Sequence, residues 1–168
     1  WPVLSMDRAK HPQLTVVSVW HNRASLVEPS LESLAAQQYR DLRLVLIDDG
    51  STDSTFAEIQ KFKQAHPGLD IIAETGPNVG LTAQLIRAIR SYAHGDYIAL
   101  HGAGDISHSR RLELQMQFME SDPRVAACGT GVGYYSDSHD LSFPDAACDV
   151  PNTSPKTYLR PRTHGSVV

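Results

Sequence analysis

The sequence has no apolar run that approaches the roughly 18 residues needed to span a membrane. It also has no excess of basic residues, because 15 Lys and Arg stand against 19 Asp and Glu and leave a formal net charge of −4. Nucleic acids and anionic membranes are bound by basic surfaces, so neither partner is indicated. The N-terminal residues lack the apolar core of a secretory signal, and we interpret them as a cut edge or a processed end.

Cysteine is scarce, with Cys128 and Cys148 as the only two. Their spacing is not the Cys-x-x-Cys of zinc or redox sites, and none of the eight histidines forms a His-x-x-x-His pair, so zinc is not indicated. Nothing else suggests a secreted disulfide scaffold. We therefore expect reduced cysteines and a cytoplasmic protein.

Residues 14–129 alternate between two patterns. Short apolar runs rich in β-branched residues are typical of strands buried on both faces, and segments with the apolar spacing of amphipathic helices separate them. The alternation with short connections predicts an α/β fold: a Rossmann-like, doubly wound and mostly parallel sheet with helices on both faces. Strands are predicted at 14–20, 42–47, 71–73, 96–100 and 125–128.

Two expectations concern helix starts. Pro29 is placed to open the first helix, where its missing N–H costs little. Arg110 and Arg111 begin the helix after the fourth strand, where the helix dipole disfavours cations. We expect them to be solvated charges, with contact to an anion as the alternative.

The sequence divides into three parts. Residues 1–13 are expected to be an N-terminal extension and residues 14–133 the α/β core. Residues 134–168, rich in Pro, Ser, Asp and Asn, are interpreted as a surface excursion that ends in the truncated start of a strand. A truncated strand would leave an unpaired edge, which makes a homo-oligomer possible.

Polar residues follow each of the first four predicted strands. Ligands of such sheets bind outside the carboxyl ends of the strands, so these residues are the site candidates. They are His21 and Asn22, Asp48 and Asp49, Glu74 and Thr75, and residues 101–105.

The sharpest local feature is Asp48-Asp49-Gly50-Ser51, which ends the second strand. Two adjacent acids at the end of an apolar strand must each find hydrogen-bond donors. A carboxylate accepts from the N–H and O–H groups of a base edge or a ribose, which favours a binding role. The alternative is a simple strand exit in which the nearby Asp53 caps the next helix.

Three interpretations of residues 101–105, HGAGD, remain open. The glycines resemble a dinucleotide fingerprint, but Ser107 replaces its third small residue and the segment follows the fourth strand rather than the first. A second interpretation is a tight turn with Asp105 or Ser107 as helix cap. The third is a metal-diphosphate site, since Mg²⁺ or Mn²⁺ often binds one or two carboxylates plus substrate phosphates.

Taken together, the motifs resemble family 2 glycosyltransferases of the GT-A fold, from about residue 14 to the end. The matching pieces are VVSVWHNRASL, SLESLAAQQYRDLRLVLIDDGSTDST, NVGLTAQLIRAI, GDYIALHGAGDISHSRRLELQ and the terminal THGSVV. The resemblance implies a nucleotide-diphosphate sugar as donor. It places the nucleotide base at Val19, His21 and Asp49, with Asp48 beside them, and puts Asn78 and Gly80 near the donor.

In this resemblance the Asp-x-Asp metal motif falls on Gly102 and Gly104, and only the following Asp105 is acidic. The resemblance therefore implies that Asp105 holds Mg²⁺ or Mn²⁺ alone, that glycine N–H groups approach the diphosphate directly, or that this copy binds poorly. An enzyme and a non-catalytic nucleotide-binding or assembly domain both stay open. The catalytic base of the family comes after the THGSVV segment, so none is assigned, and the acceptor is unknown.

Overall fold

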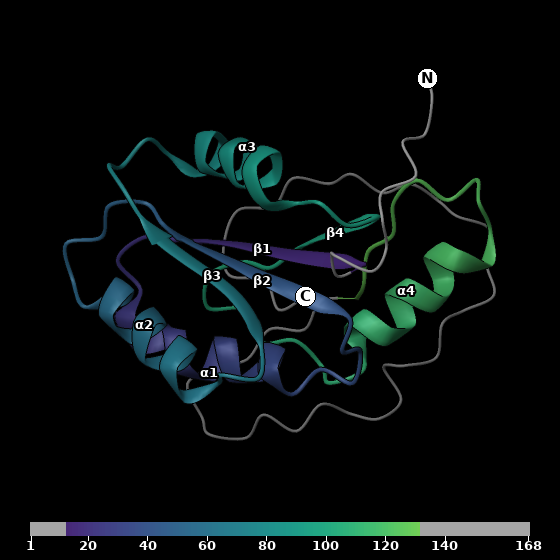
Figure 1. The fold of residues 1–168 in the computed structure, drawn as a ribbon, viewed down its shortest axis with the longest axis horizontal. Helices are drawn as coiled ribbons and strands as arrows, with labels where there is room; N and C mark the ends of the chain where they lie inside the picture. Colours follow the sequence, from purple (N-terminus) through teal and green to yellow (C-terminus); the bar gives the residue numbers. More distant parts are fainter. Residues whose placement is uncertain (1–12, 132–168) are drawn as a thin grey trace.

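The computed structural model describes residues 13–131, and the structural statements below concern these residues. The expected extension, the surface excursion and the final strand lie almost entirely outside them. Four parallel strands form one sheet in the order β3-β2-β1-β4 (Figure 1). The elements alternate strictly along the chain as β1 Leu14–Trp20, α1 Ala24–Ala35, β2 Leu42–Asp48, α2 Thr55–Ala65, β3 Asp70–Thr75, α3 Leu81–Tyr92, β4 Tyr97–Leu100 and α4 Arg111–Ser121. The predicted α/β class is confirmed.

Helices cover both faces of the sheet, as the doubly wound prediction requires. Alternate residues of a strand point to opposite faces, so the two faces have separate cores. One core joins the sheet to α1, α2 and α4, and its fully buried side chains include Trp20, Leu31, Leu44, Ile59 and Leu112. The other joins the sheet to α3 through Val17, Val45, Ile47 and Ala88.

The start of α1 differs from the prediction. The helix begins at Ala24, so Pro29 lies inside it. The earlier start is possible because two N–H groups at the helix entrance find partners across the chain: Arg23 N–H donates to Thr55 Oγ1 and Ala24 N–H donates to Asp53 Oδ2. These bonds satisfy donors that an uncapped helix leaves free.

The fifth strand, expected at 125–128, is not formed in the described part of the chain. β4 pairs with β1 alone among the described strands, and residues 125–128 do not pair with its other edge. A short run of small apolar residues does not hold a strand conformation without a partner. The prediction was wrong because it judged the segment by local composition only.

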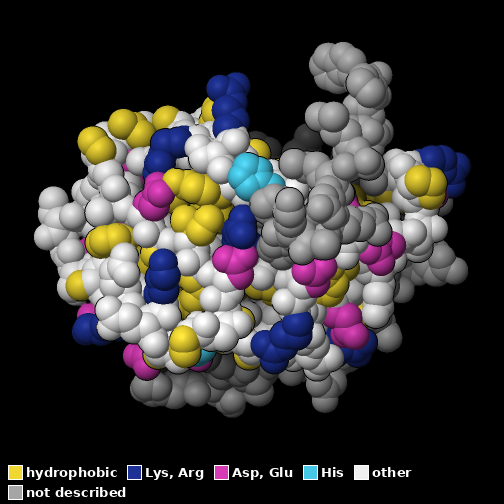
Figure 2. All heavy atoms as spheres, in the orientation of Figure 1, with side chains coloured by type: hydrophobic (Ala, Val, Ile, Leu, Met, Phe, Trp, Pro, Cys, Tyr) yellow, Lys and Arg dark blue, Asp and Glu magenta, His cyan; other side chains and the backbone are white. Residues whose placement is uncertain are grey.

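Part of the surface around α3 is apolar. Val79, Leu81 and Ile86 are large exposed hydrophobic residues on α3 or the loop before it. Figure 2 shows hydrophobic side chains gathered over this end of the molecule. Among the described helices, none has the length and apolar character needed to cross a membrane.

Candidate functional site

The strand order brings three candidate segments to one edge of the sheet. β1 lies between β2 and β4, so the turn after β1 is flanked by the acids that end β2 and by the loop 101–105 (Figure 1). Backbone bonds continue beyond the strands: Asp49 N–H donates to Trp20 O at 2.8 Å, and His101 N–H donates to Val17 O at 3.0 Å. The predicted site residues therefore share one edge.

His21 sits exposed at the exit of β1. Its Nδ1 lies 2.9 Å from the carbonyl oxygen of Asp49, which can only accept, so Nδ1 carries the proton. The other ring nitrogen, Nε2, then accepts from the side-chain amide of Asn22 at 3.2 Å. The amide of Asn78 lies 3.3 Å from the ring. The structure thus joins His21 and Asn78, which come from different loops, at one exposed rim.

The turn after β1 is tied to the turn after β2. Asn22 has a positive φ of 49°, a conformation that Asn tolerates better than most residues. Its backbone N–H donates to Ser51 Oγ, and its side-chain oxygen accepts from Thr52 N–H at 2.8 Å. The Asp53 carboxylate accepts from the Thr55 hydroxyl, from Thr55 N–H and from Ala24 N–H, and these bonds lower its pKa. The N-cap of α2 is Ser54 and not the predicted Asp53, but the Asp53 carboxylate accepts from N–H groups at the starts of both α1 and α2.

Asp49 is buried and organises the loop before α3. One carboxylate oxygen accepts from Val79 N–H at 2.8 Å and from Gln84 Nε2 at 2.9 Å, and the other accepts from Gly80 N–H at 2.9 Å. Burial opposes ionisation of this carboxyl, but the three donors outweigh it and lower its pKa. Gly80 has a φ of +89°, which a residue with a Cβ rarely adopts. Asp49 therefore fixes the shape of the loop that presents Asn78.

Asp48 is also buried, but it points to the other face of the sheet. Its Oδ2 accepts from Ser51 N–H at 3.2 Å and from Thr75 Oγ1 at 2.7 Å. Its Oδ1 is buried without any donor. The register partner on β1 is Trp20, whose indole N–H is likewise buried without an acceptor. Two unsatisfied polar groups thus lie at the ends of neighbouring strands.

The loop 101–105 is shaped by its glycines. A Cβ on Gly102 would lie 2.4 Å from Asp105 Oδ2, so the Asp105 carboxyl fills the space of a side chain at position 102. Gly104 has a φ of +91°, and a Cβ there would lie 2.7 Å from Leu26 Cδ1 of α1. Burial raises the pKa of Asp105, against the opposing effects of Arg111, the Gly102 N–H and Arg23.

Beneath this loop lies a polar cluster that sequence reasoning missed. Arg111 is 5% exposed, and it donates to Ser107 Oγ and to Leu100 O at 2.9 Å each. Its third donor, Nε, is buried with no acceptor. The expectation that Arg111 is solvated is wrong: the pitch of α4 turns it inward beside Leu112, while Arg110 stays exposed and bonds Glu113. A basic residue within an apolar helix face was the signal available in the sequence.

His101 completes the cluster as a neutral ring. Burial and the nearby Arg111 lower the pKa of His101 to about 3. The guanidinium of Arg111 can only donate, and it lies 3.4 Å from Nδ1, so Nδ1 is the accepting nitrogen. The proton is then on Nε2, which donates to Ser30 Oγ at 3.0 Å.

The loop 101–105 contains the tight turn of the second interpretation, because Asp105 N–H donates to Gly102 O at 3.0 Å, but it does not contain the expected helix cap. α4 begins at Arg111, well after the glycines, and it has no side-chain cap from Asp105 or Ser107. A dinucleotide fingerprint needs its glycines to open a helix directly, so the geometry disfavours that site.

The described residues also fit a divalent cation poorly. No group of three or more His, Cys, Asp and Glu side chains is arranged to hold a metal in this part of the chain. At the loop itself, Asp105 is the one acid, and a buried guanidinium lies beneath it. Gly102 and Gly104 supply no side-chain ligand. Residues 13–131 therefore do not by themselves make up a cation site.

Comparison with known proteins gives consistent results. The sequence profile described as "Glycosyl transferase family 2" matches residues 15–165. EpsE of Bacillus subtilis (strain 168) is 32% identical over 121 residues, which cover 72% of this chain and 43% of EpsE. A mannosyltransferase from Pyrobaculum calidifontis, PcManGT, solved with GDP-Man and Mn²⁺, superposes with a TM-score of 0.66 at 26% identity. The match covers 74% of this chain and 37% of PcManGT.

A more distant structure supports the fold alone. Staphylococcus aureus TarS 1–349, solved with UDP-GlcNAc, has a TM-score of 0.58 at 21% identity, over 65% of this chain and 31% of TarS. The matched region is thus less than half the length of EpsE, PcManGT or TarS.

Proposed function

Because the chain belongs to glycosyl transferase family 2, we propose that it contributes the donor site of an enzyme that transfers a hexosyl group from a nucleotide-diphosphate sugar. The observation that supports this most is the rim formed by His21 and Asn78, held in place by the buried carboxylate of Asp49. Such a preorganised group of polar atoms at the carboxyl edge of a parallel sheet is where this type of fold binds ligands.

We assign the residues of this site different tasks. His21 and the amide of Asn78 are exposed and present hydrogen-bonding groups toward a bound base. Asp49 acts through the loop that it holds, because both of its oxygens already accept bonds from that loop. We place Val19 and Gly80 beside the donor, as the resemblance implies, and Asp48 supports the turn after β2 through Ser51.

The proposed reaction is attack by an acceptor hydroxyl on the anomeric carbon of the donor sugar, with inversion. The new bond forms between the acceptor oxygen and the anomeric carbon. The bond from that carbon to the nucleoside diphosphate breaks, and the diphosphate leaves with its electron pair. A base takes the hydroxyl proton, and no described residue is assigned to this task. The acceptor and the sugar are not specified by the site.

Calorimetric titration of the chain with UDP and GDP tests the donor site. We expect one of them to bind, and we expect His21→Ala and Asn78→Ala each to weaken binding about tenfold, the effect of losing one good polar contact. Lys61→Ala, on the exposed face of α2 and paired with Glu58, is a matched control that leaves affinity unchanged. Absence of binding by UDP, GDP, ADP and CDP would contradict the proposal.

The alternative is a non-catalytic nucleotide-binding or assembly domain, which rests on the glycines at the positions of the metal acids and which the family match does not favour. Turnover separates the two, because only the enzyme releases free nucleoside diphosphate from the bound donor sugar. The cytoplasmic location, the absence of nucleic acid as a partner and the possible homo-oligomer stay predictions from the sequence.

A further inference from the structure

We propose that the loop 101–105 binds the diphosphate of the donor directly, without a divalent cation, using the positive charge of Arg111 beneath it. The inference rests on the proposed donor site and concerns how its most charged part is recognised. It departs from the expectation that Asp105 holds Mg²⁺ or Mn²⁺.

The first argument is the state of Arg111. Its guanidinium is almost fully buried, and no described acid forms an ion pair with it. Its acceptors are a hydroxyl and a carbonyl, and Nε has none. A buried cation normally needs an anionic partner, because neutral acceptors do not replace the solvation that it lost. The charge of Asp105 acts on Arg111, but no described carboxylate lies within ion-pair distance of it.

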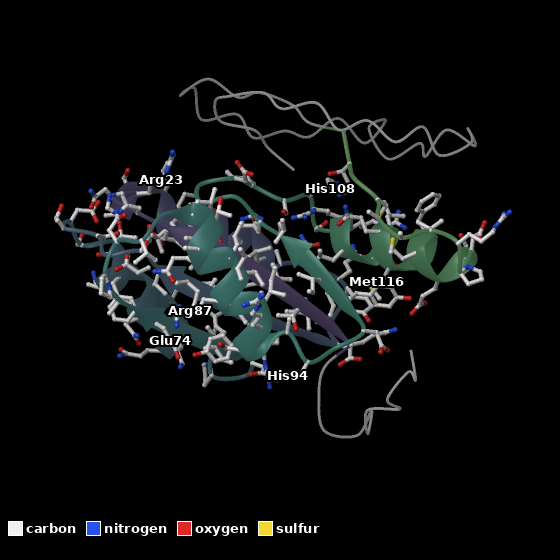
Figure 3. All side chains as sticks on the ribbon, turned by 90° about the horizontal axis from the view of Figure 1, so that it is seen from above. Arg23, Glu74, Arg87, His94, His108 and Met116 are labelled. Carbon is white, nitrogen blue, oxygen red and sulfur yellow. The ribbon has the colours of Figure 1, made fainter. Side chains whose placement is uncertain are left out.

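The second argument concerns the place at which an anion could bind. Asp105 acts at the loop as an internal anion: its carboxyl lies in the space that a Cβ of Gly102 would occupy, and the charges of Arg111 and Arg23 act on it. Gly102 is exposed, so a ligand can approach this part of the loop from solvent. Arg23, at the entrance to α1, lies along the same side of the molecule as the segment before α4 (Figure 3). A bound phosphate would take the place that the Asp105 carboxyl now holds.

The third argument is the charge balance. Among the described residues, Arg111 and Arg23 are the cations whose charge acts on the Asp105 carboxyl, and the neighbouring His101 is neutral. Adding a dication to this region would be opposed by Arg111, whereas a diphosphate dianion would be attracted. Fixed guanidinium and backbone N–H groups stabilise diphosphate charge in the same way that a metal does.

The distinguishing experiment is calorimetric titration of the 168-residue chain with UDP and GDP, in EDTA and in Mn²⁺. We expect affinity in EDTA to equal affinity in Mn²⁺ within about twofold. Asp105→Asn distinguishes a diphosphate site without a cation from a metal site at Asp105, because the two predict opposite changes in affinity. If the carboxyl competes with the diphosphate, the variant binds about three- to tenfold tighter in EDTA, because a like charge is removed. If it ligates a metal, the variant loses Mn²⁺-dependent binding.

Arg111→Gln tests the cation itself. We expect it to weaken binding in EDTA at least tenfold. Arg110→Gln is the matched control, since Arg110 is the adjacent exposed arginine and bonds Glu113. Thermal melting shows whether Arg111→Gln still folds. If it does not, Arg111→Lys, which keeps the charge, and the Asp105→Asn titration decide the question.

Electron paramagnetic resonance of free Mn²⁺ gives a readout that does not depend on activity. We expect the free-ion signal to show no more binding with chain and nucleotide together than with nucleotide alone. Tightening of binding by Mn²⁺ of about tenfold or more, lost in Asp105→Asn, would overturn this inference and leave the donor site intact. Failure of every nucleotide to bind in either condition would overturn both proposals.

Discussion

Replacing Asp49 with asparagine removes the charge on which the loop before α3 depends. The carboxylate accepts three hydrogen bonds, two at one oxygen and one at the other. The single oxygen of an asparagine can keep the bonds from Val79 and Gln84. Its amide N–H₂ would then face the N–H of Gly80, so two donors meet and neither is satisfied.

The expected loss of unfolding free energy follows from the number of hydrogen bonds that change. One hydrogen bond to a charged group is lost outright, and two become weaker neutral bonds, in a site that is 3% exposed. Such bonds contribute about 1.5–3 kcal/mol each, so we expect unfolding free energy to fall by about 2–4 kcal/mol. For a chain of this size, the melting temperature should fall by roughly 5–15 °C.

The assay is thermal melting followed by circular dichroism, with nucleotide titration on the same samples. Asp70→Asn is the control. Asp70 pairs with Arg43 at the surface and its side chain is 45% exposed, so we expect a loss of less than about 1 kcal/mol. Equal losses in the two variants, or unchanged stability and nucleotide affinity in Asp49→Asn, would refute the reasoning.

The remaining predictions concern the loop 101–105 and the surrounding packing. The pKa of His101 is lowered from 6.5 to about 3 on folding, so the unfolded chain binds this proton first as pH falls; stability is complete above pH 6.5 and decreases toward pH 3. At pH 5 the unfolding free energy lost through His101 is about 2 kcal/mol. In denaturant titrations, the unfolding free energy of His101→Asn should depend less steeply on pH, and an identical dependence would contradict the buried neutral ring. Gly104→Ala should lower unfolding free energy by about 1–3 kcal/mol, measured by urea titration, because of its positive φ and the contact with Leu26, whereas Gly68→Ala, which meets nothing within 4 Å, should change it little. Asp53→Ala should loosen the starts of both α1 and α2, seen as faster amide hydrogen exchange at Ala24 and Thr55, and exchange confined to one helix would argue against the shared carboxylate.

Much of the architecture was predictable because it depends on local patterns. The first four strands were found within about three residues of their ends, since a β-branched apolar run between helical segments has few other structures available. The clustering of His21, Asp48, Asp49 and the loop 101–105 at one edge also followed, because parallel strands place their carboxyl ends together.

The errors share a cause, which is that local patterns do not identify distant partners. The run at 125–128 looks like a strand, yet no described strand pairs with it. Pro29 looks like a helix start, yet Thr55 and Asp53 satisfy donors five residues earlier. Arg111 looks like a solvated charge, yet the packing of α4 against the sheet buries it.

The amino-acid sequence by itself determined the α/β alternation, the polar edge and the family, because periodicity and motif spacing are properties of neighbouring residues. Only the tertiary structure decided which acid holds the loop before α3 and which acid at the end of β2 keeps one carboxylate oxygen without a donor. It also decided which arginine lies beneath the glycines. Hydrogen-bond donors 30 or 31 residues away, Val79 and Gly80, give Asp49 its role. The electrostatic character of a buried group depends on such partners and on exclusion of water, and both exist only once the chain is folded.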